Sequence, residues 1–416
     1  MRASERRALL KTSNKPVNIK YHNQKLILSL FRQAETLSIS ELAKKARLSK
    51  TTIAKVIDVF GAKGLIVAAG KGESTNVGGK KPEIFAFNAA FSHVAALAIR
   101  RDRMLGAITD LRCRPLCQRE IACDARVGYE TALDEMADML RDMLRETKIE
   151  PSGLCGVMLG CEGVFDPEGN RMRYTLQHPW GSGLDIGGDL AGRLPFPARI
   201  HVDNNVRLAG YAHLEAEQYG TLVVINSGRS TGGCVIEGRE LIHGENGFVG
   251  EFGHMIIEPH SKLKCLCGGR GCFESLVSPD LVLAAARRRY ADFPDSAIHE
   301  PARRRRLAID DVFAAANAGD AFARLLMDEV VHYFTVLIHN ITILRDPSQV
   351  VIQGVYGRAG EYFLSSLREK MGNIPFYKRG HNLSLSLFAP DAGDPLILGA
   401  ARFGVDEFLR ANRLYD

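Results

Sequence analysis

The sequence predicts an α/β protein with more than one domain, and three observations support this prediction. A chain of 416 residues exceeds the usual size of a single domain. Hydrophobic residues at 46%, charged residues at 25% and 40 glycines are typical of a globular α/β protein rich in tight turns. Residues 1–90 hold 17 Lys/Arg against 6 Asp/Glu. This asymmetry indicates a basic N-terminal domain with a polyanionic partner, and a solvated basic surface is the alternative.

The N-terminus lacks the features of a secreted or membrane-bound chain. Its only apolar run in the first twenty residues, Ala8–Leu10, is too short for a signal-peptide core, and no stretch is long and apolar enough to span a bilayer. We therefore expect a cytoplasmic protein with no membrane partner, whose nine cysteines are thiols or metal ligands. Six of them lie among apolar residues and are predicted to be in the core: Cys113, Cys117, Cys123, Cys155, Cys161 and Cys234.

The N-terminal region carries three helical patterns in succession. Apolar residues recur at helical spacing over residues 18–33 and predict one amphipathic helix. Ser40 is a suitable N-cap for a second helix over residues 41–46. Ser49 is a suitable N-cap for a third helix, which should run to about Lys63.

The third predicted helix has two different faces. Its apolar face consists of Ile53, Val56, Ile57 and Phe60, and the polar and basic face near its N-terminus consists of Lys50, Thr51, Thr52 and Lys55. A recognition helix needs this division, because short polar and basic side chains must reach base edges in the major groove. A three-helix subdomain with a solvated face is the alternative. Arg47 occupies the preceding turn, where glycine is usual, so we expect a strained left-handed residue there.

A basic hairpin follows the third helix. Residues 64–67 begin a strand, residues 84–87 form its partner, and the loop 70–82 between them contains glycines and three lysines that suit close approach to phosphates. Helix, turn, helix and basic hairpin together predict a winged helix-turn-helix DNA-binding domain over residues 1–90. The predicted DNA contacts are Ser49, Lys50, Thr51, Thr52, Lys55, Lys71, Lys80 and Lys81.

Four metal-ligand residues occur within twenty positions: His254, Cys265, Cys267 and Cys272. One imidazole and three thiolates suit tetrahedral Zn²⁺ and leave no open position for water, so the predicted cofactor is a structural zinc ion. Three reduced cysteines with an unrelated histidine are the alternative. A Cys₂His₂ zinc finger is disfavoured, because its second ligand pair is absent and His254 precedes the cysteines.

The last third of the chain is mainly helical. Residues 280–323 contain basic runs at Arg287–Arg289 and Arg303–Arg306, which are either solvated helix faces or a second DNA-contacting surface. Further along, the pattern predicts a long apolar helix over 325–344, a buried parallel strand over 349–352 and a closing helix over 396–409.

The strings Gly250–His254 and Cys265–Ser275 resemble the signature of the ROK family of repressors and sugar kinases, and Gly78–Pro82 is similar to the wing of its xylose and N-acetylglucosamine repressor branch. The resemblance implies an actin-like (ribonuclease H-like), two-lobed domain of the sugar-kinase type behind the winged helix-turn-helix. It places lobe 1 over residues 91–205 and lobe 2, with the zinc site, over residues 206–416. The C-terminal helix is able to return to lobe 1.

The same resemblance implies a sugar site. Glu251 and Glu274 resemble carboxylates that hydrogen-bond sugar hydroxyls, and Asn204 resembles a further sugar contact. Asn205 and His254 complete the predicted sugar-binding set. Matched polar groups suit this role, because they reject analogues that lack a hydroxyl. A solvated loop charge is the alternative for each carboxylate, and the zinc ion would hold Glu251 and Glu274 in a fixed relation.

Three departures from the family's kinases predict that the chain is not an enzyme. The Asp-x-Gly-Gly-Thr phosphate loop of those kinases is replaced here by residues 98–106, which include Arg100 and Arg101. The second phosphate loop is altered at residues 225–233, and Gln353-Gly354 stands where a glycine pair is expected. The catalytic Asp is replaced by Asn205, whose amide cannot act as a general base.

The sequence therefore predicts a sugar-responsive transcriptional repressor of carbohydrate-metabolism genes. Its expected partners are operator DNA and a sugar or sugar-phosphate effector, and its expected state is a homodimer or a dimer of dimers. One alternative is a ROK sugar kinase with an accessory DNA-binding domain. Another is a docking platform for a phosphotransferase protein.

Overall fold

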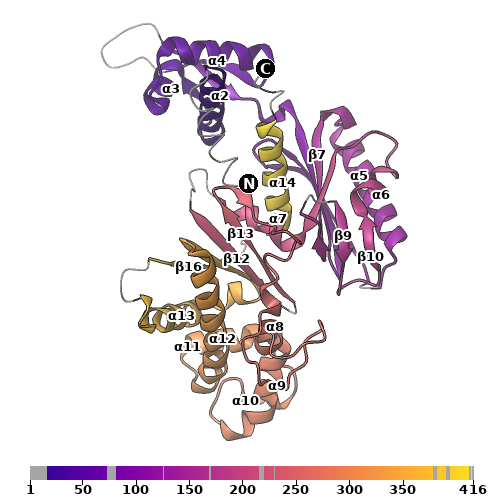
Figure 1. Ribbon diagram of the computed structural model, residues 1–416, viewed down its shortest axis with the longest axis vertical. Coiled ribbons are helices and arrows are strands. Elements are labelled where there is room, and N and C mark those ends of the chain that lie inside the picture. The colour runs from indigo at the N-terminus through magenta and orange to yellow at the C-terminus, as the bar shows by residue number, and fades with distance from the viewer. Residues whose placement is uncertain are drawn as a thin grey trace.

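The computed structural model describes residues 16–72, 81–124, 126–167, 170–214, 220–228, 230–377, 382–389, 394–411 and 414. This part of the chain forms an N-terminal head and two lobes, each lobe built on a five-stranded sheet. The head lies at one end of the molecule and the second lobe at the other (Figure 1). No helix among the described residues is long and apolar enough to cross a membrane.

The head packs three helices on a small sheet of strand order β1-β3-β2. Its elements are α2 (Pro16–Gln33), β1 (Leu37–Ser38), α3 (Ile39–Ala46), α4 (Lys50–Ala62), β2 (Ile66–Lys71) and β3 (Glu83–Phe87). The predicted apolar face of α4 is buried at Ile53, Val56, Ile57 and Phe60. The order of helices and hairpin is that of a winged helix-turn-helix.

Two capping predictions in the head have different outcomes. Ser49 caps α4 as predicted, since its hydroxyl accepts the Thr52 N–H at 3.1 Å. The prediction of Ser40 as the cap of α3 is wrong: Ser38 is the N-cap, and it shares a capping box with Glu41. The spacing decides this, because only Ser38 has a glutamate three residues later. Arg47 is left-handed as expected, with φ of 54°.

The first lobe is a sheet of order β11-β7-β4-β5-β6. Strands β4, β5 and β6 are antiparallel, whereas β7 pairs in parallel with both β4 and β11. The strands are β4 (His93–Ile99), β5 (Arg103–Asp110), β6 (Pro115–Ala122), β7 (Leu154–Cys161) and β11 (Ile200–Asn204). The remaining elements are α5 (Tyr129–Thr147), α6 (Ile186–Ala191) and a small sheet of β8 (Val164–Phe165), β9 (Arg171–Tyr174) and β10 (Ser182–Asp185).

The second lobe is a sheet of order β14-β13-β12-β15-β16, and β15 is buried and parallel to β12 and β16, as predicted for residues 349–352. The strands are β12 (Thr221–Ser227), β13 (Thr231–Glu237), β14 (Glu240–Leu241), β15 (Gln349–Gly354) and β16 (Ser384–Leu387). The helices are α8 (Phe273–Val277), α9 (Pro279–Arg289), α10 (His299–Arg303), α11 (Ile309–Ala318), α12 (Ala321–Arg345) and α13 (Glu361–Asn373).

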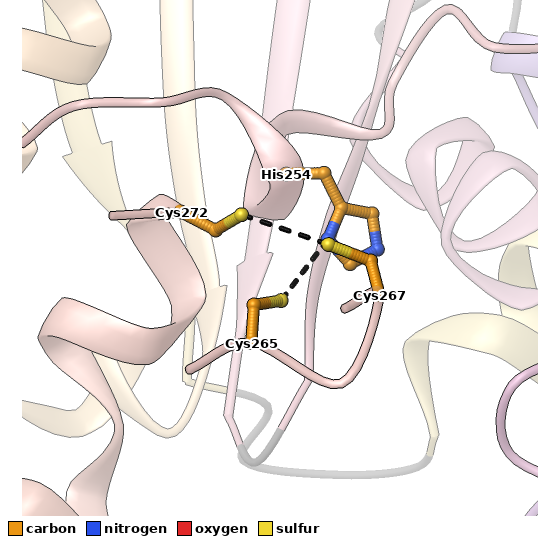
Figure 2. A group of neighbouring side chains, drawn as sticks. All are labelled: His254, Cys265, Cys267 and Cys272. Atoms are coloured by element: carbon orange, nitrogen blue, oxygen red, sulfur yellow. Dashed lines mark hydrogen bonds between the residues drawn. The ribbon is translucent and has the colours of Figure 1, made fainter. Parts of the chain in front are cut away.

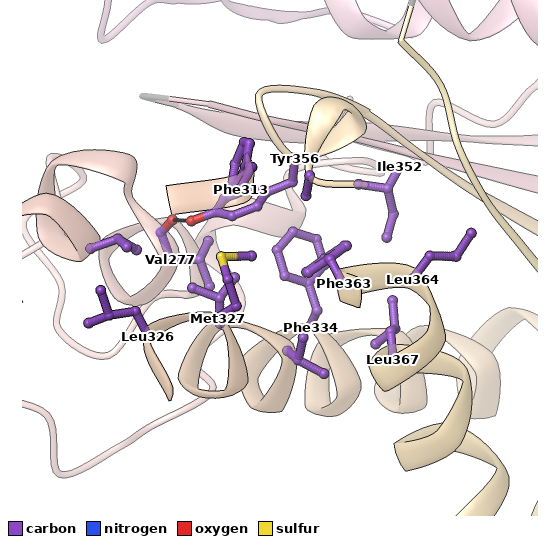
Figure 3. Close-up of a cluster of buried hydrophobic side chains, with 14 of the residues drawn as sticks. Val277, Phe313, Leu326, Met327, Phe334, Ile352, Tyr356, Phe363, Leu364 and Leu367 are labelled. Atoms are coloured by element: carbon purple, nitrogen blue, oxygen red, sulfur yellow. Dashed lines mark hydrogen bonds between the residues drawn. The ribbon is translucent and has the colours of Figure 1, made fainter. Parts of the chain in front are cut away.

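Aromatic packing fixes the long helix α12 against α13 and the turn that follows β15. Phe334 lies in a buried cluster with its ring 5.3 Å from Tyr356 and 5.2 Å from Phe363 (Figure 3). Edge-to-face pairs at such distances add to the burial of apolar area. The predicted apolar helix over 325–344 is therefore the central element of this core.

Two helices join the lobes. α7 (Asn205–Gly210) follows β11 directly, and α14 (Pro395–Arg410) packs on α7, on β7 and on β4. The chain thus returns from the second lobe to the sheet of the first.

The cysteine prediction is only partly right. Cys117, Cys161 and Cys234 are buried in the core, whereas Cys113, Cys123 and Cys155 are only partly buried and pack against its margin. Cys113 lies in the β5–β6 turn with φ of 61°, Cys123 follows the edge strand β6, and the Cys155 thiol donates to the carbonyl of His93. Turns and edge strands keep a side chain near water even when its sequence neighbours are apolar, which explains Cys113 and Cys123. Cys155 lies instead at the start of the interior strand β7.

Candidate functional site

A cleft of about 950 Å³ lies between the two lobes. Polar groups from both lobes line it, and it contains all five residues predicted to bind sugar: Asn204, Asn205, Glu251, His254 and Glu274. The structure therefore brings together residues that are up to seventy positions apart in the sequence.

The two asparagines lie where β11 ends and α7 begins. Asn204 caps α7, with its Oδ1 accepting the Val206 N–H at 2.8 Å, while its Nδ2 donates to the Gly163 carbonyl at 2.9 Å. Asn205 donates from Nδ2 to the Ile99 carbonyl at 3.1 Å. Its Oδ1 is buried and has no hydrogen-bond partner among the described residues. Both side chains are thus fixed by the chain itself at the floor of the cleft.

The two glutamates come from the second lobe. Burial raises the pKa of the Glu251 carboxyl, and the charges of His254 and Arg207 partly oppose this rise. Glu274, in α8, accepts the Thr231 N–H at 3.2 Å and the Cys265 thiol at 3.0 Å. Each carboxylate can still accept hydrogen bonds from a ligand hydroxyl, because an ionised carboxylate has about four acceptor positions.

A buried ionic network supports this floor, and the sequence analysis missed it. Asp203 lies 3.0 Å from Arg207 Nη1 and 2.8 Å from His243 Nε2. Burial would raise the pKa of the Asp203 carboxyl, but the hydrogen bond from His243 and the charge of Arg207 hold this pKa at about 2. Arg207 also donates to the carbonyls of Gly247 and Val249. The network thus ties α7 to the loop that carries Glu251.

Glu162 is a second missed residue of the cleft. It follows β7, the parallel neighbour of β11, so that Glu162 and Asn204 lie at the same edge of the sheet. Its Oε2 is 3.4 Å from Nε2 of the buried His178, which stacks on Trp180. The rule that ligands bind at the carboxyl ends of parallel strands could have found it from the buried run that precedes it.

The four predicted metal ligands converge beside the cleft (Figure 2). Their ligand atoms all lie within 4.8 Å of one another, with Cys267 Sγ 3.7 Å from Cys272 Sγ and Cys265 Sγ 3.5 Å from His254 Nδ1. Zn–S bonds of about 2.3 Å and Zn–N bonds of about 2.0–2.1 Å at tetrahedral angles place ligand atoms about 3.6–3.8 Å apart. The donor set therefore fits a tetrahedral zinc ion.

Glycine is required inside this loop. Gly271 has φ of 71°, and a Cβ there would collide with the carbonyl of Glu258. Only glycine adopts this backbone without cost, and the turn brings Cys272 back toward Cys267.

Two of the positions predicted to depart from the kinase pattern, Arg100 and Gln353, also line the cleft. The guanidinium of Arg100 lies there 2.7 Å from the Asp394 carboxylate, and Gln353 Oε1 is 2.7 Å from His213 Nε2. Both side chains are thus engaged within the protein. Arg229, in the altered second loop, lies outside the described residues.

The predicted DNA contacts on α4 are accessible. Ser49, Lys50, Thr51 and Lys55 are exposed and Thr52 is half-buried, with its hydroxyl 2.9 Å from Ser49 Oγ. On the hairpin, Lys71 and Lys81 are exposed, and Lys80 lies outside the described residues.

These features define a class of protein: an actin-like α/β domain with a polar interlobe cleft, preceded by a winged helix-turn-helix head. A model described as ROK family matches residues 102–401, and the chain belongs to the ROK family.

The chain is similar to both repressors and kinases. It is 21% identical to the xylose repressor of Bacillus subtilis over 394 residues, which cover 94% of this chain and 97% of that protein. It is 29% identical to the glucokinase of Thermotoga maritima over 249 residues, 59% of this chain and 77% of that protein. Among solved structures, a ROK family transcriptional regulator, a homologue of the Escherichia coli MLC protein, matches with a TM-score of 0.74 and 20% identity over 95% of this chain and 99% of that chain.

Proposed function

We propose that this ROK protein is a transcriptional repressor that responds to a sugar and has no kinase activity. The observation that carries the proposal is a single chain with an exposed basic helix in a winged head and, behind it, a polar cleft with an amide at the base position. The full-length similarity to a xylose repressor supports it. In this proposal residues 1–90 bind operator DNA, and residues 91–205 and 206–416 form the lobes that bind the effector.

The sugar part of the proposal depends on the chemistry of the cleft. Asn204, Glu162, Glu251 and Glu274 offer acceptors, and His254 lies among them as a metal ligand that orients its neighbours. A sugar presents several hydroxyl donors in a fixed array, so a site of convergent acceptors discriminates strongly between epimers. Asn205 replaces a carboxylate with a neutral amide, and because its Nδ2 already donates to the Ile99 carbonyl, its Oδ1 is the atom left to accept a ligand hydroxyl.

The proposed repressor differs from the alternative, a sugar kinase with an accessory DNA-binding head, in that it transfers no phosphoryl group. A kinase needs a base for the sugar hydroxyl and a backbone cradle for the nucleotide phosphates. Asn205 cannot supply the first, and Arg100, paired with Asp394, occupies the turn that would supply the second. The 29% identity to a glucokinase is the observation that favours the alternative, a kinase with an accessory head. Sugar-dependent ATP consumption by the purified chain would establish that alternative.

DNA binding by the head is tested with duplexes selected from a random pool by the wild-type chain. Lys50→Ala and Thr51→Ala should each weaken binding of the selected duplex by about tenfold, because each side chain can reach a phosphate or a base edge. Arg288→Ala is the matched control, since Arg288 is an exposed cation on α9 at the far end of the molecule. Weakened binding in Arg288→Ala with unchanged binding in the α4 variants would assign DNA binding to the basic run on α9 instead.

We also propose that zinc is the structural cofactor of the second lobe. His254, Cys265, Cys267 and Cys272 would hold it, and the bound ion would fix the chain between Glu251 and Glu274. The purified chain should contain about one zinc per protomer. Cys272→Ser should lose the metal and have a lower melting temperature. Cys155→Ser is the control and should keep the metal content and melting temperature of the wild type. Full metal content in Cys272→Ser would refute this site.

A dimeric assembly completes the proposal. Two winged heads on one homodimer, or on a dimer of dimers, would contact successive major-groove faces of a palindromic operator. A monomer on the selected duplex, or a selected sequence without two-fold symmetry, would argue against it.

A further inference from the structure

The helix α14 runs from the cleft to the head. At its N-terminus, Asp394 accepts the Leu396 N–H at 2.9 Å and pairs with Arg100 at 2.7 Å, and both Arg100 and Pro395 line the cleft. At 16 residues, the helix extends about 24 Å. Figure 1 shows its other end directly beneath the head. One rigid element therefore contacts both candidate binding regions.

Asp406, near the C-terminal end of α14, binds two arginines from different parts of the molecule. Its Oδ1 lies 3.2 Å from Arg32 Nη1, in the last turn of α2, and its Oδ2 lies 2.6 Å from Arg239 Nη2, in the β13–β14 turn. Only 8% of the Asp406 side chain is exposed. A single carboxylate thus joins the head, the closing helix and the second lobe.

The partners of Asp406 are themselves held in place. The carbonyl of Arg239 accepts the Tyr211 hydroxyl and the Arg410 guanidinium, each at 3.0 Å. From the first lobe, Arg112 in the β5–β6 turn donates to three carbonyls of the head at the end of α2, those of Phe31, Arg32 and Ala34, at 3.3, 3.2 and 2.7 Å. The ion pair is therefore part of a defined docking contact, whose apolar component is a buried core shared by α2, α4 and α14.

Charge makes Asp406 the critical member of this contact. Arg32 and Arg239 approach the two oxygens of one carboxylate, so both guanidiniums lie beside the same negative charge. With the carboxylate present, both are attracted to α14. Without it, two partly buried positive charges face each other and repel the head from the second lobe.

We infer that Asp406 is the positioning residue of the DNA-binding head and that α14 carries a change at the cleft to it. The inference rests on the proposed function for its biological meaning, but the contact itself can be tested without DNA or sugar. A movement of the second lobe displaces Arg239, which shifts Asp406 between its two partners and changes how firmly Arg32 is held.

Amide hydrogen exchange of the full chain tests the contact. In Asp406→Asn, amides of α2 should exchange about tenfold faster than in the wild type, while those of α12, in the core of the second lobe, should be unchanged. Asp406→Glu should restore slow exchange, because the carboxylate is kept. Glu369→Gln is the control, since Glu369 is an exposed carboxylate on α13 of the second lobe, away from this contact. If Asp406→Asn does not fold, Arg32→Gln takes its place.

Unchanged exchange of α2 in Asp406→Asn or Arg32→Gln would overturn the inference. Faster exchange throughout the chain, with no rescue in Asp406→Glu, would also overturn it, because it would show a general loss of stability instead of undocking. Wild-type binding to a selected duplex, measured in parallel with and without D-xylose, D-glucose or N-acetyl-D-glucosamine, decides the proposed function separately. Failure of that binding leaves the exchange result valid, so the two failures are distinguishable.

Discussion

Glu251 illustrates how a single side chain would determine sugar recognition. It is half-buried in the cleft, and no side chain of the described residues donates a hydrogen bond to its carboxylate, whereas Glu274 accepts from Thr231 and Cys265. An amide in its place keeps the shape but supplies a donor where hydroxyl donors already point. Specificity of this kind depends on matched donors and acceptors more than on contact area.

Glu251→Gln should weaken binding of the best sugar by about 10- to 100-fold, the loss expected when a charged hydrogen bond of about 1.5–3 kcal/mol is removed. Thermal shift against a sugar library measures this. Glu245→Gln, an exposed change in the same loop, is the control and should leave the shift intact. A normal shift in Glu251→Gln would remove Glu251 from the site.

The pH dependence of stability tests the buried ionic network of Asp203, Arg207 and His243. The folded pKa of Asp203, about 2, lies below the unfolded value of 3.8, so its contribution to stability is present above pH 4 and is lost as the pH falls toward 2. Asp203→Asn leaves Arg207 and His243 without this carboxylate, and the variant should be about 3–5 kcal/mol less stable at pH 7. The difference in free energy of unfolding between the variant and the wild type should become smaller below pH 4, because the wild-type carboxylate becomes protonated as the pH falls toward 2. Denaturation at several pH values measures this difference, and a difference that stays constant from pH 7 to 2 would contradict the network. Asp58→Asn, an exposed change, is the control and should be as stable as the wild type.

Short sequence patterns predicted many of the helices and strands correctly. They did not predict contacts between residues that are far apart in the sequence. The two faces of α4, the Ser49 cap and the buried strand β15 follow from short patterns, because their determinants are a few residues apart. The Asp203–His243 pair does not, since its members are forty residues apart and lie on different lobes. The packing of α14 on β7 could not be predicted from local patterns either, because the two elements lie far apart in the sequence.

Ser38 and Ser40 offer a direct comparison of a correct and an incorrect cap. Ser38→Ala removes the capping box with Glu41, whose pKa is lowered chiefly by the backbone hydrogen bond from Ser38, and should destabilise the head by about 1 kcal/mol. Ser40→Ala should have little effect, because Ser40 lies inside α3. Urea denaturation followed by a probe in the head measures both. Equal losses would mean that the serines share the cap.

The sequence predicted the residues that line the candidate site, but not the interactions that hold them in place. The metal ligands and the cleft residues follow from a short motif and a family resemblance, and the structure brings each set together. The double role of His254, beside the cleft and within the metal cluster, becomes clear only in three dimensions. Glu162 lacked a motif of its own, and its role depends on the strand that it follows.

The whole molecule combines a basic head at one end (Figure 1), the helices α7 and α14 that join the lobes, and a cleft lined by residues of both lobes. In the proposed function a sugar can control DNA binding only if it binds one arrangement of the lobes better than the other. The coupling is then reciprocal: DNA must change the affinity for the sugar by the same factor. The contacts of α14 at both of its ends provide the physical route.

The central claim is that the cleft controls the head. Its most direct test is the affinity of the wild-type chain for its selected duplex, measured by fluorescence anisotropy across a panel of sugars and sugar phosphates. One chemical class of these ligands should change the affinity by about tenfold, while ATP is not consumed. Identical duplex affinity with every member of the panel would contradict it.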